Sequence, residues 1–247
     1  MAGHSKWAQI KRQKGVADAR RGQLFTKLAR EISVAAKLGG GDPDANFRLR
    51  IAIQKARAEN MPNDNIKRAI DRATSDAGGD HYDEIYYEGF GPGGAAIMVK
   101  ALTDNRNRTV GEVRAVFTRA GGNLGESGSV NYLFDQLGII IIKADGADPD
   151  DLALQAIDAG AEDIKTADGA VEVYTAPTAL KAVQDALGAQ GMQVEDAAIT
   201  MQPKATLNLG EEEAIKVVRL MERLEDLDDV QEVYTNVEIS DEVLAQV

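Results

Sequence analysis

The chain has 247 residues but no cysteine, only two histidines and a single tryptophan, and aromatic residues make up 5% of it. The lack of cysteine excludes disulfide bonds, thiolate metal sites and cysteine nucleophiles. With His4 and His81 as the only histidines, the chain has few residues from which a Ser-His-Asp triad or a histidine metal site could be built. No motif supports catalysis, so we expect no enzymatic activity, no cofactor and no metal.

Long apolar runs are also absent. No window approaches the roughly 20 apolar residues that a membrane-spanning helix needs. The N-terminus, Met1–Trp7, has no apolar segment of the kind found in secretory signals, and it runs directly into a basic segment without a separate leader. These absences predict a cytoplasmic protein that does not contact membranes.

Charge is abundant and unevenly distributed. Residues 1–75 contain 16 of the 28 Lys and Arg but only 7 of the 40 Asp and Glu, which gives them a net charge of +9 in a chain whose total is −12. The rest of the chain therefore carries −21. A cationic segment of this kind is typical of a surface that contacts polyphosphate, and the acidic remainder is expected to stay away from it.

Three amphipathic helices are predicted within the basic segment. The apolar residues of the first lie on one arc from Gln23 onwards, until Gly39–Gly41 end the helix. Asp42-Pro43 supplies a cap and a first-turn proline for the second helix, and the third begins near Pro62. The helices would form a small bundle with cations on its outer faces. Ser75–Asp80, with two glycines, is interpreted as a linker.

Alternating strands and helices follow. Residues 136–203 contain the regular order βαββαβ, the ferredoxin-like split unit. A β-α-β series on each side of it is short of partners, so we infer that the two series combine into one domain that holds the βαββαβ unit as an insertion. The elements predicted on the two sides are strand Ala95–Leu102, helix Val110–Ala120 and strand Val130–Phe134, then strand Ala205–Leu209, helix Glu211–Glu225 and strand Val233–Ile239.

The predicted fold class is α+β, with an N-terminal three-helix domain followed by two α/β domains, one a ferredoxin-like βαββαβ unit inserted in the other. The expected domains are a basic helical nucleic-acid-binding domain with a flexible N-terminal tail (1–78), a split α/β domain (79–135 and 204–247) and an inserted acidic domain (136–203). The inserted unit lacks the paired aromatics of an RNA-recognition motif and has three lysines, no arginine and twelve carboxylates. It should therefore repel nucleic acid.

One glycine-rich stretch formally matches a nucleotide-binding motif. Gly89–Gly94 contains G-x-G-x-x-G, but the dinucleotide fingerprint needs a helix after it, and here an apolar strand follows. Pro92 also lacks the N–H that a phosphate cradle would use. We interpret this stretch as a turn that leads into a strand.

Asn105–Thr109 lies at a predicted strand-to-helix junction. There Arg106 and Arg108, beside the exposed N–H groups of a helix start, would form an auxiliary anion site. Helix capping by Asn107 or Thr109, with incidental arginines, explains the pattern equally well.

The candidate nucleic-acid surface combines the basic tail with the outer helix faces. Within the first 22 residues six cations face one carboxylate, Asp18, which favours phosphate contact over an ordinary solvated face. Trp7, between cations, is suited either to stack on bases or to dock the tail on the bundle. The candidate binding residues are Lys6, Trp7, Lys11, Arg12, Lys14, Arg20, Arg21, Lys27, Arg30, Arg48, Arg50, Lys55, Arg57, Lys67 and Arg68.

Several strings of the sequence closely resemble the YebC/PmpR family. They are Met1–Lys11, Asp18–Gly22, Phe25–Leu28, Asn60–Ile66, Tyr87–Gly94 and Thr103–Thr109, and the likeness runs from the first residue into the C-terminal strand. The resemblance implies a helical N-terminal domain followed by two α/β domains. Bacterial members are usually described as DNA-binding transcriptional regulators. The mitochondrial relative is a translational activator of cytochrome c oxidase subunit I, and members are also regarded as ribosome-associated factors that relieve stalling. The lack of an organellar leader indicates a bacterial-type member.

The residues and the resemblance together predict a non-enzymatic regulator of gene expression that binds nucleic acid through residues 1–75. DNA and ribosomal RNA both stay open as targets, since no helix-turn-helix of standard spacing and no zinc site is visible to read base edges. The ribosome is a partner that the resemblance implies, and a monomer is favoured. The alternative is a protein-interaction adaptor that works through its acidic α/β domains, with the basic segment as an anchor.

Overall fold

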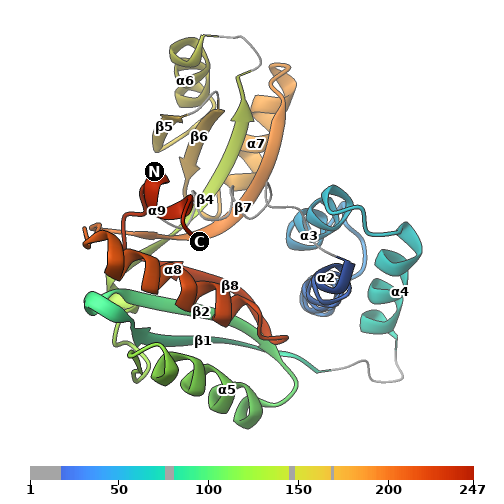
Figure 1. The fold of residues 1–247 in the computed structure, drawn as a ribbon. Helices are drawn as coiled ribbons and strands as arrows, with labels where there is room; N and C mark the ends of the chain where they lie inside the picture. Colours follow the sequence, from blue (N-terminus) through green and yellow to red (C-terminus); the bar gives the residue numbers. More distant parts are fainter. Residues whose placement is uncertain (1–17, 76–80, 145–147, 168–169) are drawn as a thin grey trace. The chain divides into compact units, whose positions relative to one another are not determined.

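The computed structural model describes residues 18–75, 81–144, 148–167 and 170–247 (Figure 1). These residues form two compact units: Asp135–Gln202, and the residues that precede and follow it. Asp135–Gln202 contains one four-stranded sheet. The unit formed by the preceding and following residues contains a group of helices and another four-stranded sheet.

Residues 18–75, here called the helical domain, contain helices α2 (Asp18–Gly39), α3 (Phe47–Ala58) and α4 (Asn63–Thr74). α2 begins about one turn before the predicted start at Gln23. The apolar stripes of the three helices meet because each repeats at helical spacing. Their shared core includes Leu28, Ile32, Leu49, Ile53 and Ile66.

The second helix begins later than predicted, because Asn46 and not Asp42-Pro43 caps it. The Oδ1 of Asn46 accepts the N–H of Leu49 at 3.1 Å. Its Nδ2 donates to the carbonyls of Ala35 and Gly40, both at 2.8 Å. One buried side chain thus ties the end of α2 to the start of α3 and satisfies groups that both helix ends would otherwise leave unpaired.

Residues 81–134 and 203–247, here called the split domain, form an antiparallel sheet in the order β3-β1-β2-β8. Its helices α5 and α8 pack against one face of this sheet, where Phe117, Met221 and Leu224 meet Ile97, Val99 and Val233 from the strands. The elements are β1 (Asp83–Phe90), η1 (Pro92–Gly94), β2 (Ala96–Thr103), α5 (Arg106–Arg119), β3 (Asn123–Leu124), η2 (Asn131–Leu133), α8 (Glu211–Glu225), β8 (Val230–Thr235) and α9 (Asp241–Leu244).

Asp135–Gln202, here called the inserted domain, has the sheet order β5-β6-β4-β7, which is the strand order of a ferredoxin-like βαββαβ unit. Apolar residues at every second position of its inner strands, such as Ile140, Ile142 and Val173, are fully buried, as are Leu180 and Leu187 of its second helix. The elements are β4 (Phe134–Lys143), α6 (Pro149–Asp158), β5 (Asp163–Ala167), β6 (Ala170–Thr175), α7 (Leu180–Ala189) and β7 (Val194–Pro203).

The predicted fold class is confirmed. N-terminal helices precede two four-stranded sheets, and the pairing of β8 with β2 shows that the chain returns to the first sheet after building the second. The turn predicted at Gly89–Gly94 is also present, as η1 between the paired strands β1 and β2. Of the predicted linker Ser75–Asp80, only Ser75 lies within the described residues.

Two strand predictions were wrong, and two strands, β1 and β3, were missed. Val130–Phe134 alternates like a strand, but Asn131–Leu133 form the turn η2, because the carboxylate of Glu88 accepts the N–H groups of Val130 and Asn131. Ala205–Leu209 forms no strand and contributes only an isolated bridge from Leu207 to Val237. Of the missed strands, β1 pairs with β2 along its whole length, and the two-residue strand β3 pairs with the end of β1.

A close approach explains one glycine of β1. A Cβ atom on Gly89 would lie 2.6 Å from the carbonyl oxygen of Asn123 and 2.8 Å from the Phe117 ring. The strand therefore has no room for a side chain where β3 and α5 meet it.

Among the described helices, none is long and apolar enough to cross a membrane.

Candidate nucleic-acid interface

The residues predicted to bind nucleic acid fall into three groups. Lys6, Trp7, Lys11, Arg12 and Lys14 lie outside the described residues, and only the backbone of Arg20 is described. The other two groups belong to the helical domain and differ in what their side chains contact. One group is exposed to solvent, and the other contacts the split domain.

The exposed group includes Arg57, at the end of α3, and Lys67 and Arg68 on α4. Arg68 donates to Asn65 at 2.7 Å and to the carbonyl of Asp64, which orients its guanidinium along the helix surface. Arg21 is also exposed, and so are two cations that the candidate set left out, Lys37 and Arg72. Arg50 is partly buried and donates to the carbonyls of Pro43 and Asp44.

The group that contacts the split domain is Lys27, Arg30, Arg48 and Lys55, here called the basic face. The sequence placed these cations on outer faces of the bundle, and they do lie outside its apolar core. Their polar atoms, however, meet the split domain. The structure therefore gives each a protein partner, and their predicted role in phosphate binding stays a prediction.

Part of the basic face contacts the sheet surface that α5 and α8 leave uncovered. Because Val99 and Val233 point into the core, their neighbours Lys100 and Glu232 point to the opposite side. There Glu232 accepts from Lys55 at 3.1 Å, Glu84 accepts from Arg48, and Lys100 lies 3.9 Å from Glu31 of α2. Arg48 also donates to Glu31 at 3.0 Å. Opposite charges thus alternate along one chain of contacts: Glu84, Arg48, Glu31, Lys100, Glu232 and Lys55.

The position of Lys100 within this charge chain sets its ionisation. Burial alone would lower the pKa of this lysine, but the nearby carboxylates of Glu232 and Glu31 outweigh burial and raise the pKa. Burial also opposes the charge of Arg48, and again Glu31 and Glu84 outweigh it, so that the pKa of Arg48 is raised. Both side chains stay cationic, as the alternation requires.

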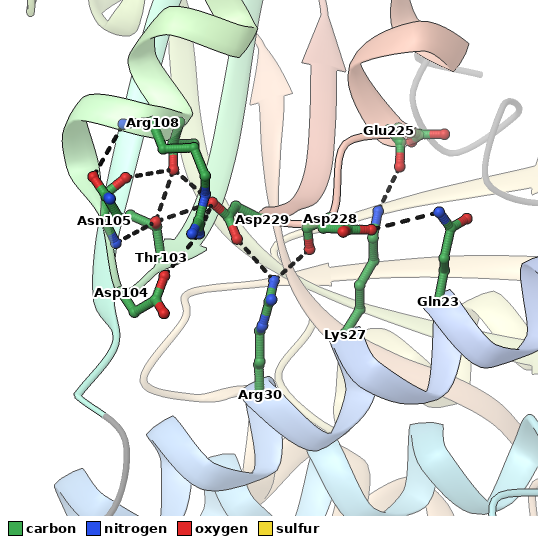
Figure 2. Close-up of polar contacts among 11 residues, drawn as sticks. Gln23, Lys27, Arg30, Thr103, Asp104, Asn105, Arg108, Glu225, Asp228 and Asp229 are labelled. Atoms are coloured by element: carbon green, nitrogen blue, oxygen red, sulfur yellow. Dashed lines mark hydrogen bonds and ion pairs between the residues drawn. The ribbon is translucent and has the colours of Figure 1, made fainter.

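The rest of the basic face meets the turn between α8 and β8 (Figure 2). Lys27 donates to the carbonyl of Glu225, and Arg30 donates to the carbonyl of Asp228 and, at 3.0 Å, to the carboxylate of Asp229. The guanidinium of Arg30 also lies 5.6 Å from the centre of the Tyr82 ring. These contacts hold α2 beside the edge of the split domain.

Asp229 is 1% exposed and is the centre of this second group of contacts. Besides Arg30, its carboxylate accepts from Thr103 at 3.0 Å, from Thr109 at 2.6 Å and from Arg108 at 2.7 Å. Burial alone would raise the pKa of Asp229, but the hydrogen bonds from Thr109, Arg108 and Thr103 and the charge of Arg30 outweigh it and hold the pKa below its usual value. A buried carboxylate needs such complete pairing to stay ionised.

Arg106 and Arg108, the predicted auxiliary anion site, each contact a carboxylate of the split domain. Arg106 donates to Asp83 at 2.7 Å, and Arg108 donates to Asp104 at 2.7 Å as well as to Asp229. These contacts raise the pKa of both arginines.

The cap of α5 is Asn105 and not Asn107 or Thr109. Its Oδ1 accepts the N–H of Arg108 at 3.1 Å, whereas the hydroxyl of Thr109 donates to Asp229.

A cleft of about 410 Å³ opens beside these residues and is lined mainly by acidic groups. Its lining is Gln23, Arg30, Asp104, Arg108, Glu112, Asp226, Leu227, Asp228 and Asp229. With five carboxylates against two guanidiniums, the lining of this cleft carries a net negative charge. No group of three potential metal ligands occurs in the part of the chain that the structure describes.

The acidic partners of the basic face were not predictable from the sequence. Glu84, Asp229 and Glu232 come from segments 81–90 and 228–235, far from the helical domain in sequence. Nothing in their local pattern distinguishes them from the other carboxylates of the acidic remainder. Their role depends on strand pairing, which brings Lys100 and Glu232 to neighbouring positions.

The chain matches known proteins over its whole length. The family described as TACO1/YebC protein N-terminal domain matches residues 5–76, and TACO1/YebC second and third domain matches residues 82–237. A probable transcriptional regulatory protein of Herpetosiphon aurantiacus is 54% identical over 244 residues, which are 98% of this chain and 97% of the relative. One of Chloroflexus aurantiacus is 54% identical over 249 residues, 100% of this chain and 99% of the relative.

A solved structure has the same fold. The crystal structure of a conserved hypothetical protein from Aquifex aeolicus matches with a TM-score of 0.84 and 48% sequence identity, covering 92% of this chain and 94% of that one.

Proposed function

Because the chain belongs to the TACO1/YebC family, we propose that it is a non-enzymatic regulator of gene expression that binds nucleic acid through its helical domain and N-terminal tail. The observation that carries the proposal is the separation of charge. The exposed cations Arg57, Lys67, Arg68 and Arg72 belong to a segment with a net charge of +9, and the rest of the chain is strongly acidic. Such a protein would present one end to phosphates and repel them elsewhere.

Transcription and translation offer different nucleic acids to the same surface. The relatives are named probable transcriptional regulatory proteins, which favours DNA. On duplex DNA the exposed lysines and arginines of α4 would contact backbone phosphates, since the sequence shows no helix-turn-helix of standard spacing. RNA read by backbone and shape, including that of the ribosome, suits exposed lysines and arginines equally well.

The test compares a DNA duplex of about 30 base pairs with a hairpin RNA of similar phosphate content, by fluorescence anisotropy at a series of salt concentrations. The variant Lys67→Gln/Arg68→Gln/Arg72→Gln removes three exposed cations of α4. If each contacts one phosphate, the slope of log affinity against log salt should become shallower by about 2.7 on duplex DNA, and affinity should fall without change in sequence preference.

The matched control is Lys216→Gln/Arg219→Gln/Arg223→Gln, which makes the same change of charge at exposed positions of α8 in the split domain. We expect this variant to bind as the wild type does or slightly more weakly. Equal effects of the two triple variants would refute a localised interface. Absence of salt-dependent binding by the wild type to either polymer would refute the proposed function and leave the adaptor alternative.

A further inference from the structure

The basic face is attached to the split domain through polar groups. Its partners are the carbonyls of Glu225 and Asp228 and the carboxylates of Asp229, Glu84 and Glu232. The apolar core of the helical domain and that of the split domain share no residue, although the buried side chains of Leu102 and Tyr234 lie on the same sheet face as Lys100 and Glu232. Polar interfaces between domains of one chain resemble transient protein–protein interfaces and separate more readily than apolar ones.

We propose that the basic face is a second nucleic-acid-binding surface, which the split domain covers in this structure with oxygen atoms that take the place of phosphate oxygens. The inference rests on the proposed function and extends it. Binding of a polyanion at the exposed cations would place further phosphates near Lys27, Arg30, Arg48 and Lys55. Those phosphates would compete with the carboxylates for these four cations. Once phosphates replace the carboxylates, the helical domain would detach from the split domain.

The split domain is built to lose Arg30 without leaving a buried charge unpaired. Asp229 would keep three donors from its own domain: Thr103, Thr109 and Arg108. An unpaired buried carboxylate would strongly oppose separation of the two domains. The three remaining donors keep Asp229 paired, so this cost does not arise.

Glu232 is supported in the same way. After the loss of Lys55 it would still accept from the hydroxyl of Tyr234, and Lys100 lies opposite it on β2. Both carboxylates thus keep partners within the split domain, so that the closed arrangement is reversible.

Phosphate could satisfy a hydrogen-bond donor of the helical domain that the split domain leaves without a partner. The Nε of Arg30 is buried and has no hydrogen-bond partner among the described residues, while its NH1 alone serves Asp228 and Asp229. A phosphate can accept two parallel N–H groups from one guanidinium. Exchange of a carbonyl and one carboxylate oxygen for a phosphate would therefore satisfy a donor that the split domain leaves unsatisfied.

The first experiment weakens the cover and leaves the basic face intact. In Glu84→Gln/Glu232→Gln, two carboxylates become neutral amides of the same shape. Each was an exposed or partly exposed ion pair, so the two together correspond to roughly a two- to thirtyfold change in an equilibrium constant. We expect this variant to bind both duplex DNA and hairpin RNA more tightly by a factor in that range.

The matched control is Glu212→Gln/Glu213→Gln, which removes the same charge from exposed positions in the first turn of α8. It reports the general gain from a less acidic protein. The inference requires the Glu84/Glu232 variant to gain clearly more affinity than this control. Equal gains would overturn the inference while the proposed function stands.

A second experiment measures the separation of the helical and split domains directly, without relying on affinity. Since the chain lacks cysteine, Leu38→Cys and Tyr132→Cys, both at exposed positions, accept a donor and an acceptor dye specifically. Energy transfer between the helical and split domains should change when nucleic acid binds, and the Glu84→Gln/Glu232→Gln change should move the unbound value towards the bound one. Transfer that stays constant while nucleic acid binds would overturn the inference.

A third variant tests the covered cations themselves. Lys27→Gln/Arg30→Gln should lower affinity and make the salt slope shallower, although both side chains are covered in the closed arrangement. Unchanged binding would show that nucleic acid does not reach them. Failure of the wild type to bind at all would overturn both the proposed function and this inference.

Discussion

Replacement of Asp229 by Asn tests whether one buried carboxylate holds the turn between α8 and β8. The native group accepts four hydrogen bonds, from Thr103, Thr109, Arg108 and Arg30, while only 1% exposed. The amide keeps the shape but loses the charge, and its NH2 group faces donors. Removal of one partner from a buried ion pair costs about 3–5 kcal/mol.

The lower end of that range applies here. The Arg108 side chain is 42% exposed and can be solvated by water when its partner disappears, whereas Arg30, at 16%, has less access. We therefore expect the Asp229→Asn variant to lose about 3 kcal/mol of unfolding free energy at neutral pH. In a protein of this size such a loss lowers the melting temperature by roughly 6–12 °C.

Scanning calorimetry is the suitable assay, because the two compact units can give separate transitions. The transition of the unit that contains the helical and split domains should shift, and that of the inserted domain should not. Asp226→Asn, an exposed carboxylate in the same turn, is the matched control and should change stability by less than about 0.5 kcal/mol.

Acid provides an independent check of the same reasoning. The pKa of Asp229 is lowered in the folded protein, so its contribution is complete above the unfolded pKa of about 3.9 and is lost as the pH falls through the folded value. The stability gap between wild type and Asp229→Asn should therefore shrink below about pH 4. A gap under about 1 kcal/mol at neutral pH, or one that does not shrink in acid, would refute the account.

Two further predictions concern buried polar side chains that organise the backbone. Glu88→Gln should lose about 2 kcal/mol in a urea titration, because its carboxylate accepts N–H groups of Gly128, Val130 and Asn131 at 2.7–2.8 Å. This loss should fade in acid, since those bonds outweigh burial and lower the pKa of Glu88, and a loss that persists unchanged in acid would contradict it. Asn46→Ala should lose about 2 kcal/mol through its cap and its two bonds to carbonyls, and hydrogen exchange should rise in the first turn of α3; exchange that rises evenly through the domain would count against a capping role.

Elements with a complete local signal were predictable from the sequence. α8 runs over Glu211–Glu225, as predicted, because apolar residues recur at helical spacing and three glutamates occupy its first turn. The inserted domain likewise contains the predicted order βαββαβ. The place of the inserted domain followed from pairing logic, since a strand without neighbours must find one elsewhere.

Elements that depend on distant partners were not predictable. β1 has large side chains on both faces, including Tyr86 and Tyr87, so it shows no clean alternation of apolar and polar residues. Val130–Phe134 shows one but forms a turn, because Glu88, 42 residues before Val130, takes its N–H groups. A carboxylate that acts over such a sequence distance leaves no trace near the residues that it organises.

The candidate interface shows the same limit at the level of single cations. Lys27 and Lys67 both lie on polar faces of amphipathic helices within a basic segment, and the sequence gives no reason to separate them. Only the docking of α2 on the turn at Glu225–Asp229 makes one a partner of the split domain and leaves the other exposed.

The path of the chain through the inserted domain bears on how the protein is synthesised. The strands β2 and β8 belong to one sheet but are separated by more than a hundred residues, so the split domain stays incomplete until translation is almost finished. The N–H of Lys204 donates to the carbonyl of Leu133 at 2.9 Å, so the chain leaves and re-enters the split domain at neighbouring points.

An inserted domain whose ends meet in this way closes its own loop. Once it has folded, the chain that follows emerges beside the chain that preceded it, and the entropy of bringing β8 back to β2 no longer grows with the number of residues in between. The nascent protein can thus mature in order, with the inserted domain complete first and the host sheet finished by the last strand to leave the ribosome.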